Sequence, residues 1–160
     1  MVKITFNDEN RGMIYAVGMT RYLRAIGNQQ RSDNGSKQTL EGNILGTAGE
    51  MGVIVHLDIP LDRWHGLWDY QRPDVDCYEV KTSSRQRKDA KLWIQRNKIE
   101  RNPEQIYILA NSHIPLDGVW LLGWTRAADV VEHGTYDVKK RLYSLPHHEL
   151  APMDEILYAL

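Results

Sequence analysis

Three charged residues near the middle of the chain have types and spacing that suit chemistry on a phosphate ester. Asp74 follows a proline, and Glu79 and Lys81 are separated by one residue. Because side chains alternate along a strand, Cys77, Glu79 and Lys81 are expected on one face, with Asp74 folding back beside Glu79. Mg²⁺ is held by one or two carboxylates together with water and substrate phosphate, and a neighbouring lysine can stabilise developing charge. This stretch therefore predicts a metal site that hydrolyses a phosphodiester.

Two aspartates closely precede Glu79, and the choice between them affects the geometry of the site. Pro73 restrains the backbone that enters Asp74, which suits a metal ligand. Asp76 lies at an odd offset from Glu79, so a regular strand would direct it to the opposite face, although a bulge before Glu79 would reverse that assignment. We predict Asp74 as the ligand, with Asp76 or even Asp69 as alternatives.

A fourth acid, Glu50, lies in a stretch of low polarity. It is the only charged residue between Gly42 and Val55, where the pattern predicts a buried helix. A buried carboxylate is unfavourable unless it is paired or bound to a cation. Glu50 therefore needs a partner, which could be a metal ion, an arginine or backbone donors.

Glycines recur at every third position of the same helix, at Gly46, Gly49 and Gly52. No Gly-Lys-Ser or Gly-Lys-Thr sequence follows them, so a phosphate-binding loop is not indicated. Close packing of the helix against a sheet explains them better.

The elements that would position these residues follow from periodicity and turn signals. Helices are predicted at 8–26 and 40–57, with a loop at 27–38. A short helix capped by Thr125 and stopped by Gly134 is expected, and helical character at 154–160. This order predicts an α/β or α+β domain with helices on the faces of a sheet. Strands are predicted at 2–6, 66–70, 77–83, 92–95, 105–110, 119–124 and 141–144, the second and third forming a hairpin.

The motifs, taken together, resemble the signature of the PD-(D/E)XK nuclease superfamily, which includes restriction enzymes, Holliday-junction resolvases and phage exonucleases. Pro73-Asp74 and Glu79-x-Lys81 are similar to its central motif. Gly46-x-x-Gly49-Glu50 resembles its first helix, whose glutamate often completes the metal shell. The resemblance covers about residues 40–124, and the four residues between Asp74 and Glu79 form a shorter gap than many members have.

The resemblance implies a restriction-endonuclease-like core, in which a central mixed sheet is flanked by helices. It implies that Asp74 and Glu79 bind Mg²⁺, for which Mn²⁺ would substitute, and that Lys81 is the catalytic lysine. By the same resemblance, Glu50 is an accessory metal ligand and the carbonyl of Val80 a further one. The leading hypothesis is a Mg²⁺-dependent DNA endonuclease or related nuclease, encoded by a phage or another mobile element.

Charge is distributed unevenly along the chain, although the formal net charge is only −1. Residues 81–101 carry eight Lys or Arg against two acids, whereas residues 102–160 carry eight acids against four bases. A basic segment balanced by an acidic tail is compatible with a nucleic-acid groove on one face, and a solvated loop is the alternative. The residues predicted to contact DNA phosphates are Arg85, Arg87, Lys88, Lys91, Arg96 and Lys98.

The composition indicates one folded domain over residues 1–160, because 160 residues with 42% hydrophobic content can bury a full core. No stretch suits a membrane span or a signal peptide, so we expect a cytoplasmic protein. The single cysteine, Cys77, excludes an internal disulfide and a thiolate zinc site. A homodimer is plausible, since cutting two strands needs two sites.

Two other functions compete with nuclease activity. The first is a nucleic-acid-binding or assembly protein that keeps the fold with a vestigial site. The second is a phage structural or regulatory protein that binds a protein partner through its acidic C-terminal part.

Overall fold

The chain forms two long helices first and most of its strands afterwards. The structure, a computed structural model, describes residues 1–28, 38–67 and 72–158. Within these residues, no helix is both long and apolar enough to cross a membrane. The elements are β1 (Val2–Thr5), α1 (Asp8–Gly27), α2 (Leu40–Leu57), β2 (Tyr78–Ser83), β3 (Lys91–Gln95), α3 (Arg96–Arg101), β4 (Ile106–Asn111), β5 (Gly118–Arg126), α4 (Ala127–His133), β6 (Thr135–Asp137) and β7 (Leu142–Pro146).

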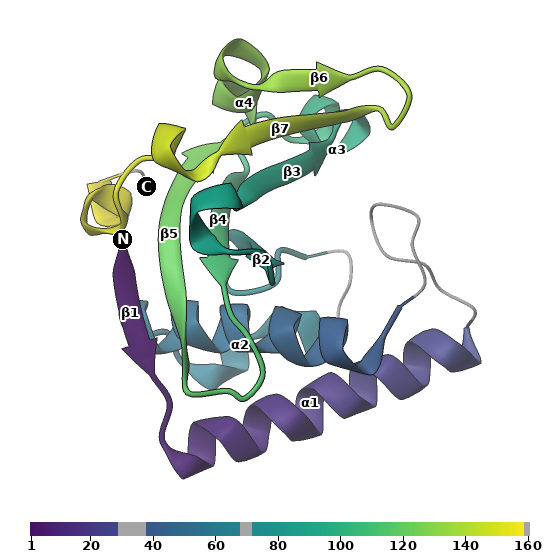
Figure 1. Ribbon diagram of the computed structural model, residues 1–160, viewed down its shortest axis with the longest axis vertical. Helices are drawn as coiled ribbons and strands as arrows, with labels where there is room; N and C mark the ends of the chain where they lie inside the picture. Colours follow the sequence, from purple (N-terminus) through teal and green to yellow (C-terminus); the bar gives the residue numbers. More distant parts are fainter. Residues whose placement is uncertain (29–37, 68–71, 159–160) are drawn as a thin grey trace.

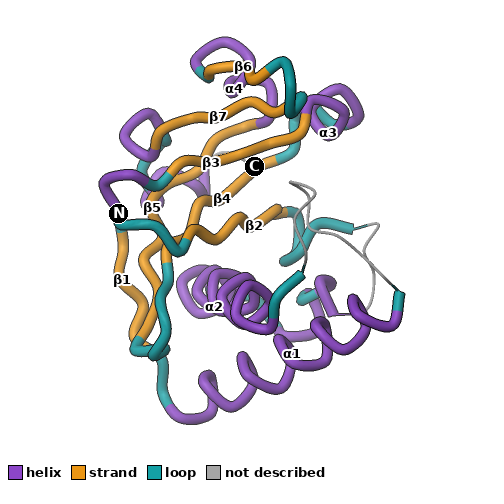
Figure 2. Tube along the Cα trace, turned by 45° about the vertical axis from the view of Figure 1, so that its right-hand side comes forward, coloured by secondary structure: helices purple, strands orange, loops and turns teal. Residues whose placement is uncertain are grey.

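Two sheets and two helices are stacked in layers (Figure 1, Figure 2). The larger sheet is mixed, with the order β1-β5-β4-β2, and β2 runs parallel to β4. The smaller sheet is antiparallel, with the order β3-β7-β6. Helix α2 packs on one face of the larger sheet and α1 lies against α2, while the smaller sheet covers the opposite face. The predicted mixed α/β class is confirmed.

The pairing of β2 with β4 fixes the direction of each side chain on β2. Val80 pairs with Ile108, and both lie in the core beneath α2. Glu79 pairs with Tyr107, which belongs to the core between the two sheets. Because paired residues share a face, Glu79 and Lys81 lie on the side of the smaller sheet. The predicted alternation along β2 is confirmed, but Cys77 precedes the strand and packs against the α2 core, so its predicted placement beside Glu79 is wrong.

Both long helices begin and end where their sequences predict. The Asn7 side chain accepts a hydrogen bond from the Asn10 amide and forms a capping box at the start of α1. Thr39 caps α2 through the amide of Gly42, and Asp58 ends the helix in a left-handed conformation. The predicted helices 8–26 and 40–57 are confirmed, and most of the predicted loop at 27–38 falls on residues outside the described ranges.

Two local predictions are wrong, and one short strand was not predicted. The predicted hairpin is not formed, because β2 pairs with β4. Of the strand predicted at 66–70, Gly66 lies in a 3₁₀ turn, and residues 68–70 lie outside the described part of the chain. Thr125 belongs to β5, so Arg126 occupies the cap position of α4 without a capping hydrogen bond. Strand β6 was not predicted, because three residues carry too little alternation to be recognised. The stop at Gly134 is confirmed.

Helix α2 approaches the larger sheet at Gly49 more closely than a side chain permits. A Cβ atom at Gly49 would lie 2.1 Å from Thr82 Oγ1 and 3.1 Å from the Ala110 Cβ atom. A Cβ atom at Gly46 would meet nothing within 4 Å. A Cβ atom at Gly52 would lie 2.3 Å from Val119 Cγ1, so the predicted close packing applies at Gly49 and Gly52 and not at Gly46.

Replacing Gly49 and Gly46 should have opposite effects on stability. Gly49→Ala should destabilise the fold by about 1–3 kcal/mol, because the helix must shift away from the sheet. Gly46→Ala should leave stability unchanged or raise it by up to about 1 kcal/mol, because alanine favours the helix. Chemical denaturation of both variants measures the difference, and equal stabilities would mean that α2 does not touch the sheet at Gly49.

Candidate active site

Asp74 lies at the open edge of the larger sheet. Strand β2 is the last strand in that sheet, and the amide of Val80 donates a hydrogen bond of 3.0 Å to Asp74 Oδ2. The amide of Val80 therefore points away from β4. Since the amide and carbonyl of one residue leave a strand on the same side, the Val80 carbonyl also points to this edge. The Asp74 carboxylate and the Val80 carbonyl thus share the free edge of β2.

A tight turn fixes the backbone around Asp74. Val75 and Tyr78 exchange two backbone hydrogen bonds, of 3.1 and 2.8 Å, so the chain reverses within the two residues between them. On the other side, the Asp74 carbonyl accepts hydrogen bonds from the amides of His65 and Gly66, both at 3.0 Å. Asp74 is therefore held from both directions, which favours a fixed position for its carboxylate.

Asp76 occupies the turn itself and is directed elsewhere. It adopts a left-handed conformation with φ of 51°, and its carboxylate lies 3.2 Å from the guanidinium of Arg63. The Arg63 carbonyl also accepts the Asp76 amide at 2.8 Å. The chain between Asp74 and β2 forms a turn and not a bulged strand. Asp76 lies inside that turn, whereas Asp74 lies along the edge of β2. Asp69 lies outside the described residues.

Glu79 and Lys81 form an ion pair on the face of β2 that looks toward the smaller sheet. Their charged groups are 3.5 Å apart, and their side chains are 19% and 26% exposed. Both side chains are therefore largely buried, and the pair is not an ordinary surface salt bridge. Glu79 and Lys81 flank Val80, whose amide binds the Asp74 carboxylate.

Glu50 is buried in α2 and has an arginine as its partner. Arg21 from α1 donates to both carboxylate oxygens, at 2.7 and 2.6 Å, and Trp64 Nε1 donates to Oε2 at 2.5 Å. Burial raises the pKa of Glu50, Arg21 opposes that effect, and the negative charge of Asp74 raises the pKa further. The partner of Glu50 in the structure is therefore an arginine, one of the three kinds of partner expected from the sequence. The role of Glu50 as an accessory metal ligand stays a prediction.

The predicted residues reach the beginning of β2 from different directions. Glu50 comes from the α2 side, Glu79 and Lys81 lie on the opposite face, and Asp74 lies at the edge between them. Gly66, whose amide donates to the Asp74 carbonyl, lies against the Glu50 carboxylate, and the negative charge of Asp74 raises the pKa of Glu50. Residues 1–28, 38–67 and 72–158 contain no cluster of three His, Cys, Asp or Glu side chains that could hold a metal ion.

The donor set at this edge nevertheless fits Mg²⁺. Asp74, Glu79 and the Val80 carbonyl are all hard oxygen donors, and Mg²⁺ in proteins usually keeps several water ligands. One or two carboxylates are therefore sufficient, and a cluster of three is not required.

The six predicted DNA contacts do not form one surface. Strands β2 and β4 run parallel, so residues that follow them lie at one end of the sheet and residues that precede them lie at the other. The Arg85 carbonyl accepts a hydrogen bond from the Asn111 side chain, and the Arg87 guanidinium lies 4.0 Å from the centre of the Trp120 ring. Arg85, Arg87, Lys88 and Lys91 therefore belong to the end where β2 finishes, whereas Arg96 and Lys98 belong to the end where Asp74 lies.

Sequence reasoning missed the partners of Glu50. Arg21 and Trp64 are separated from it by 29 and 14 positions. A usable signal was present in α1, where Arg21 falls on the same helical stripe as the buried residues Ile14, Gly18 and Ala25. A cation on one buried stripe and an acid on another predict a pair.

Searches for related proteins find no matching family model, no matching curated protein and no matching solved structure.

Proposed function

We propose that the protein is a Mg²⁺-dependent nuclease with a restriction-endonuclease-like core, which hydrolyses DNA phosphodiester bonds at the beginning of β2. The observation that carries this proposal is the placement of Asp74. Its carboxylate is fixed at the edge of β2 by the Val80 amide, and Val80 is flanked in the strand by the paired residues Glu79 and Lys81. A carboxylate at the strand edge, with a carboxylate and a lysine on the adjoining face, would supply metal binding and charge stabilisation around one segment of β2.

Each residue has a separate role in the proposal. Asp74 and Glu79 would hold the cation, with the Val80 carbonyl as a third donor, and the cation would polarise the phosphate and activate water. Lys81 would stabilise negative charge that develops on the phosphate oxygens. Glu50 would act through position, since its pair with Arg21 ties α1 to α2.

The open edge of β2 supports an extended substrate. Among the residues that the structure describes, β2 has a strand neighbour on one side only, and neither Glu79 nor Lys81 is fully buried. A DNA strand can therefore approach the carboxylates without displacing a strand of the sheet.

Lys81→Ala tests the proposal. The variant should lose about 10²-fold or more of the rate of supercoiled plasmid cleavage, because Lys81 acts on charge that develops in the transition state. Its Mg²⁺ isotherm and its DNA affinity should stay near those of the wild type, since ground-state binding does not depend on Lys81. An unchanged cleavage rate would exclude Lys81 as the catalyst.

A nucleic-acid-binding protein without catalytic activity is the second candidate. The observation that favours it is the bidentate pair of Glu50 with Arg21, which occupies both oxygens of one predicted metal ligand. Calorimetric titration separates the two functions. DNA binding without any Mg²⁺ or Mn²⁺ isotherm would support the inactive protein, whereas a metal isotherm that Glu79→Ala removes would support the nuclease.

A further inference from the structure

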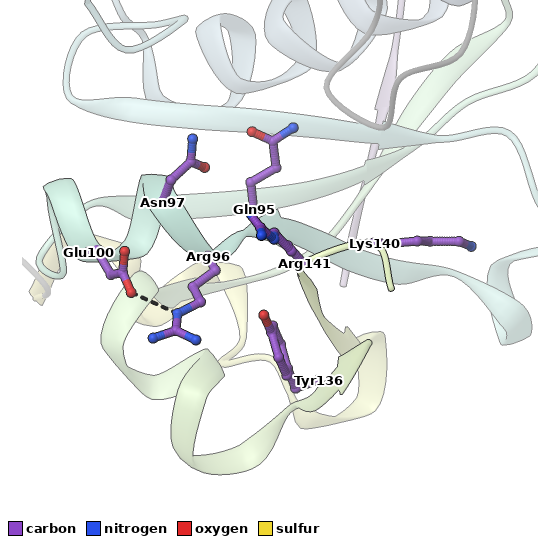
Figure 3. A pocket seen from close by; sticks show the side chains of 7 residues that line it. All are labelled: Gln95, Arg96, Asn97, Glu100, Tyr136, Lys140 and Arg141. Carbon is purple, nitrogen blue, oxygen red and sulfur yellow. Dashed lines mark hydrogen bonds and ion pairs between the residues drawn. The ribbon is translucent and has the colours of Figure 1, made fainter. Parts of the chain in front are cut away.

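A hollow of about 550 Å³ lies between α3 and the turn that joins β6 to β7 (Figure 3). Its lining is polar and has more cations than acids, in contrast to the apolar lining usual for small-molecule pockets. The side chains that line it are Gln95, Arg96, Asn97, Glu100, Tyr136, Lys140 and Arg141.

The hollow carries a net positive charge. Three cations line it against one acid, Glu100, and that acid is already paired with Arg96 at 2.7 Å. Lys140 also lies 5.7 Å from the centre of the Trp93 ring, which adds an aromatic surface beside the cations. An anion with several oxygens is the ligand that this charge favours.

The β6–β7 turn is held in place before any ligand binds. Asp137 Oδ1 accepts hydrogen bonds from the amides of Lys139 and Lys140, at 3.0 and 3.1 Å. Arg141 has a left-handed conformation with φ of 54°, and its carbonyl accepts the Arg96 amide at 3.0 Å. The backbone of the turn is thus tied to α3, so less backbone entropy is lost when a ligand binds there.

The hollow lies at the same end of the molecule as Asp74. Gln95 at the end of β3 pairs with Leu142, which brings the β6–β7 turn beside α3. Residues 102–105 then lead from α3 into the beginning of β4, and the Gln105 side chain donates a hydrogen bond of 2.7 Å to the Cys77 carbonyl, one residue before β2. Figure 2 shows α3, the β6–β7 turn and the beginning of β2 at one end of the two sheets.

We infer that this hollow binds the phosphodiester backbone of the DNA strand that reaches the candidate active site. Arg96, Lys140 and Arg141 contact its phosphates, and Tyr136 provides a ring against the sugar or base. The inference rests on the proposed function, whose substrate path it specifies. It replaces the sequence-based path along Arg85, Arg87 and Lys88, because those residues lie at the opposite end of a six-residue strand, about 20 Å away.

Two charge-matched double variants test this path. The first, Lys140→Ala with Arg141→Asn, removes two cations from the turn, and asparagine tolerates the left-handed backbone there. The second, Arg85→Ala with Lys88→Ala, removes two cations at the opposite end. The measurement is the fluorescence anisotropy of a short labelled DNA duplex, titrated at several salt concentrations in EDTA so that no metal-dependent cleavage occurs.

The turn variant should bind about tenfold more weakly at low salt. Its slope of log affinity against log salt should be shallower by about 1.8, which corresponds to two lost phosphate contacts at about 0.9 each. The opposite-end variant should keep the wild-type slope. Arg96→Gln, which leaves the turn sequence intact, should flatten the slope by about 0.9 and so provides a second reading if the turn variant misfolds.

Wild-type slopes in both the turn variant and Arg96→Gln would overturn the inference, as would a flattened slope confined to the opposite-end variant. Failure of the wild-type protein to bind DNA would overturn it too. The nuclease proposal is tested separately by plasmid cleavage. If the protein does not cleave a plasmid with Mg²⁺ but its DNA affinity still depends on the turn, the nuclease proposal fails and the inference about the hollow stands.

Discussion

On the proposed function, Asp74→Asn should lower the rate of Mg²⁺-dependent DNA cleavage by about 10²-fold or more, which corresponds to roughly 3 kcal/mol of transition-state stabilisation. Asparagine has nearly the same shape and can still accept the hydrogen bond from the Val80 amide. The substitution therefore removes a charge at the edge of β2 while it preserves the local fold. Plasmid cleavage as a function of Mg²⁺ concentration measures the loss.

Asp76→Asn is the matched control, since it removes the same charge two residues away. Asp76 lies in the turn and pairs with Arg63, whose side chain is 59% exposed, so the loss of this pair should change stability by less than about 1 kcal/mol. The control variant should cleave DNA at the wild-type rate. If Asp76→Asn is inactive and Asp74→Asn is active, the turn rearranges when metal binds and Asp76 is the ligand.

Local sequence signals were sufficient for the helices and for most strands. The apolar periodicity of α1 and α2, with Asn7 and Thr39 at their caps, contains the information that each helix needs. The pairing of β2 with β4 is different, because Tyr78 lies 28 positions before its partner Ile106. Alternation shows that a segment is a strand, but it does not show which strand lies beside it.

The same distinction applies to the candidate site. Glu79 and Lys81 lie within one strand, so a spacing of two residues predicts their contact, and Pro73 marks the restrained entry to Asp74. The basic residues of segment 81–101 lie at two ends of the sheet. The number of charges in the sequence does not predict this separation, because it depends on the direction in which β4 runs. The basic run Lys139, Lys140 and Arg141 was hidden by an average over the acidic tail, although three consecutive bases were a visible signal.

The pair of Arg21 with Glu50 should be the most sensitive point for stability in the candidate site. Arg21→Ala leaves Glu50 buried, at 4% exposure, with Trp64 as its remaining side-chain donor. Removal of one partner from a buried ion pair typically destabilises a protein by about 3–5 kcal/mol. For a domain of this length, that loss lowers the melting temperature by roughly 6–20 °C.

Arg24→Ala provides the control for Arg21→Ala, because it removes a cation from an exposed position on the same helix. Its stability should change by no more than about 1 kcal/mol, since interactions of an exposed charge contribute little. The double variant Arg21→Met with Glu50→Leu should recover most of the stability lost in Arg21→Ala, since it removes the charge that Arg21 neutralises. Equal melting temperatures for Arg21→Ala and Arg24→Ala would mean that Glu50 has another partner.

The pH dependence of Arg21→Ala tests whether a buried charge causes the loss. Without Arg21, burial and Asp74 both raise the pKa of Glu50 and no guanidinium opposes them. The folded variant then binds a proton at a pH where the unfolded chain does not, so its stability increases as the pH falls through the raised pKa toward the ordinary value of 4.5. The difference in free energy of unfolding between Arg21→Ala and wild type should therefore become smaller as the pH falls over that range. A difference that stays constant would show that Arg21 stabilises the protein through packing between α1 and α2, and not by neutralising Glu50.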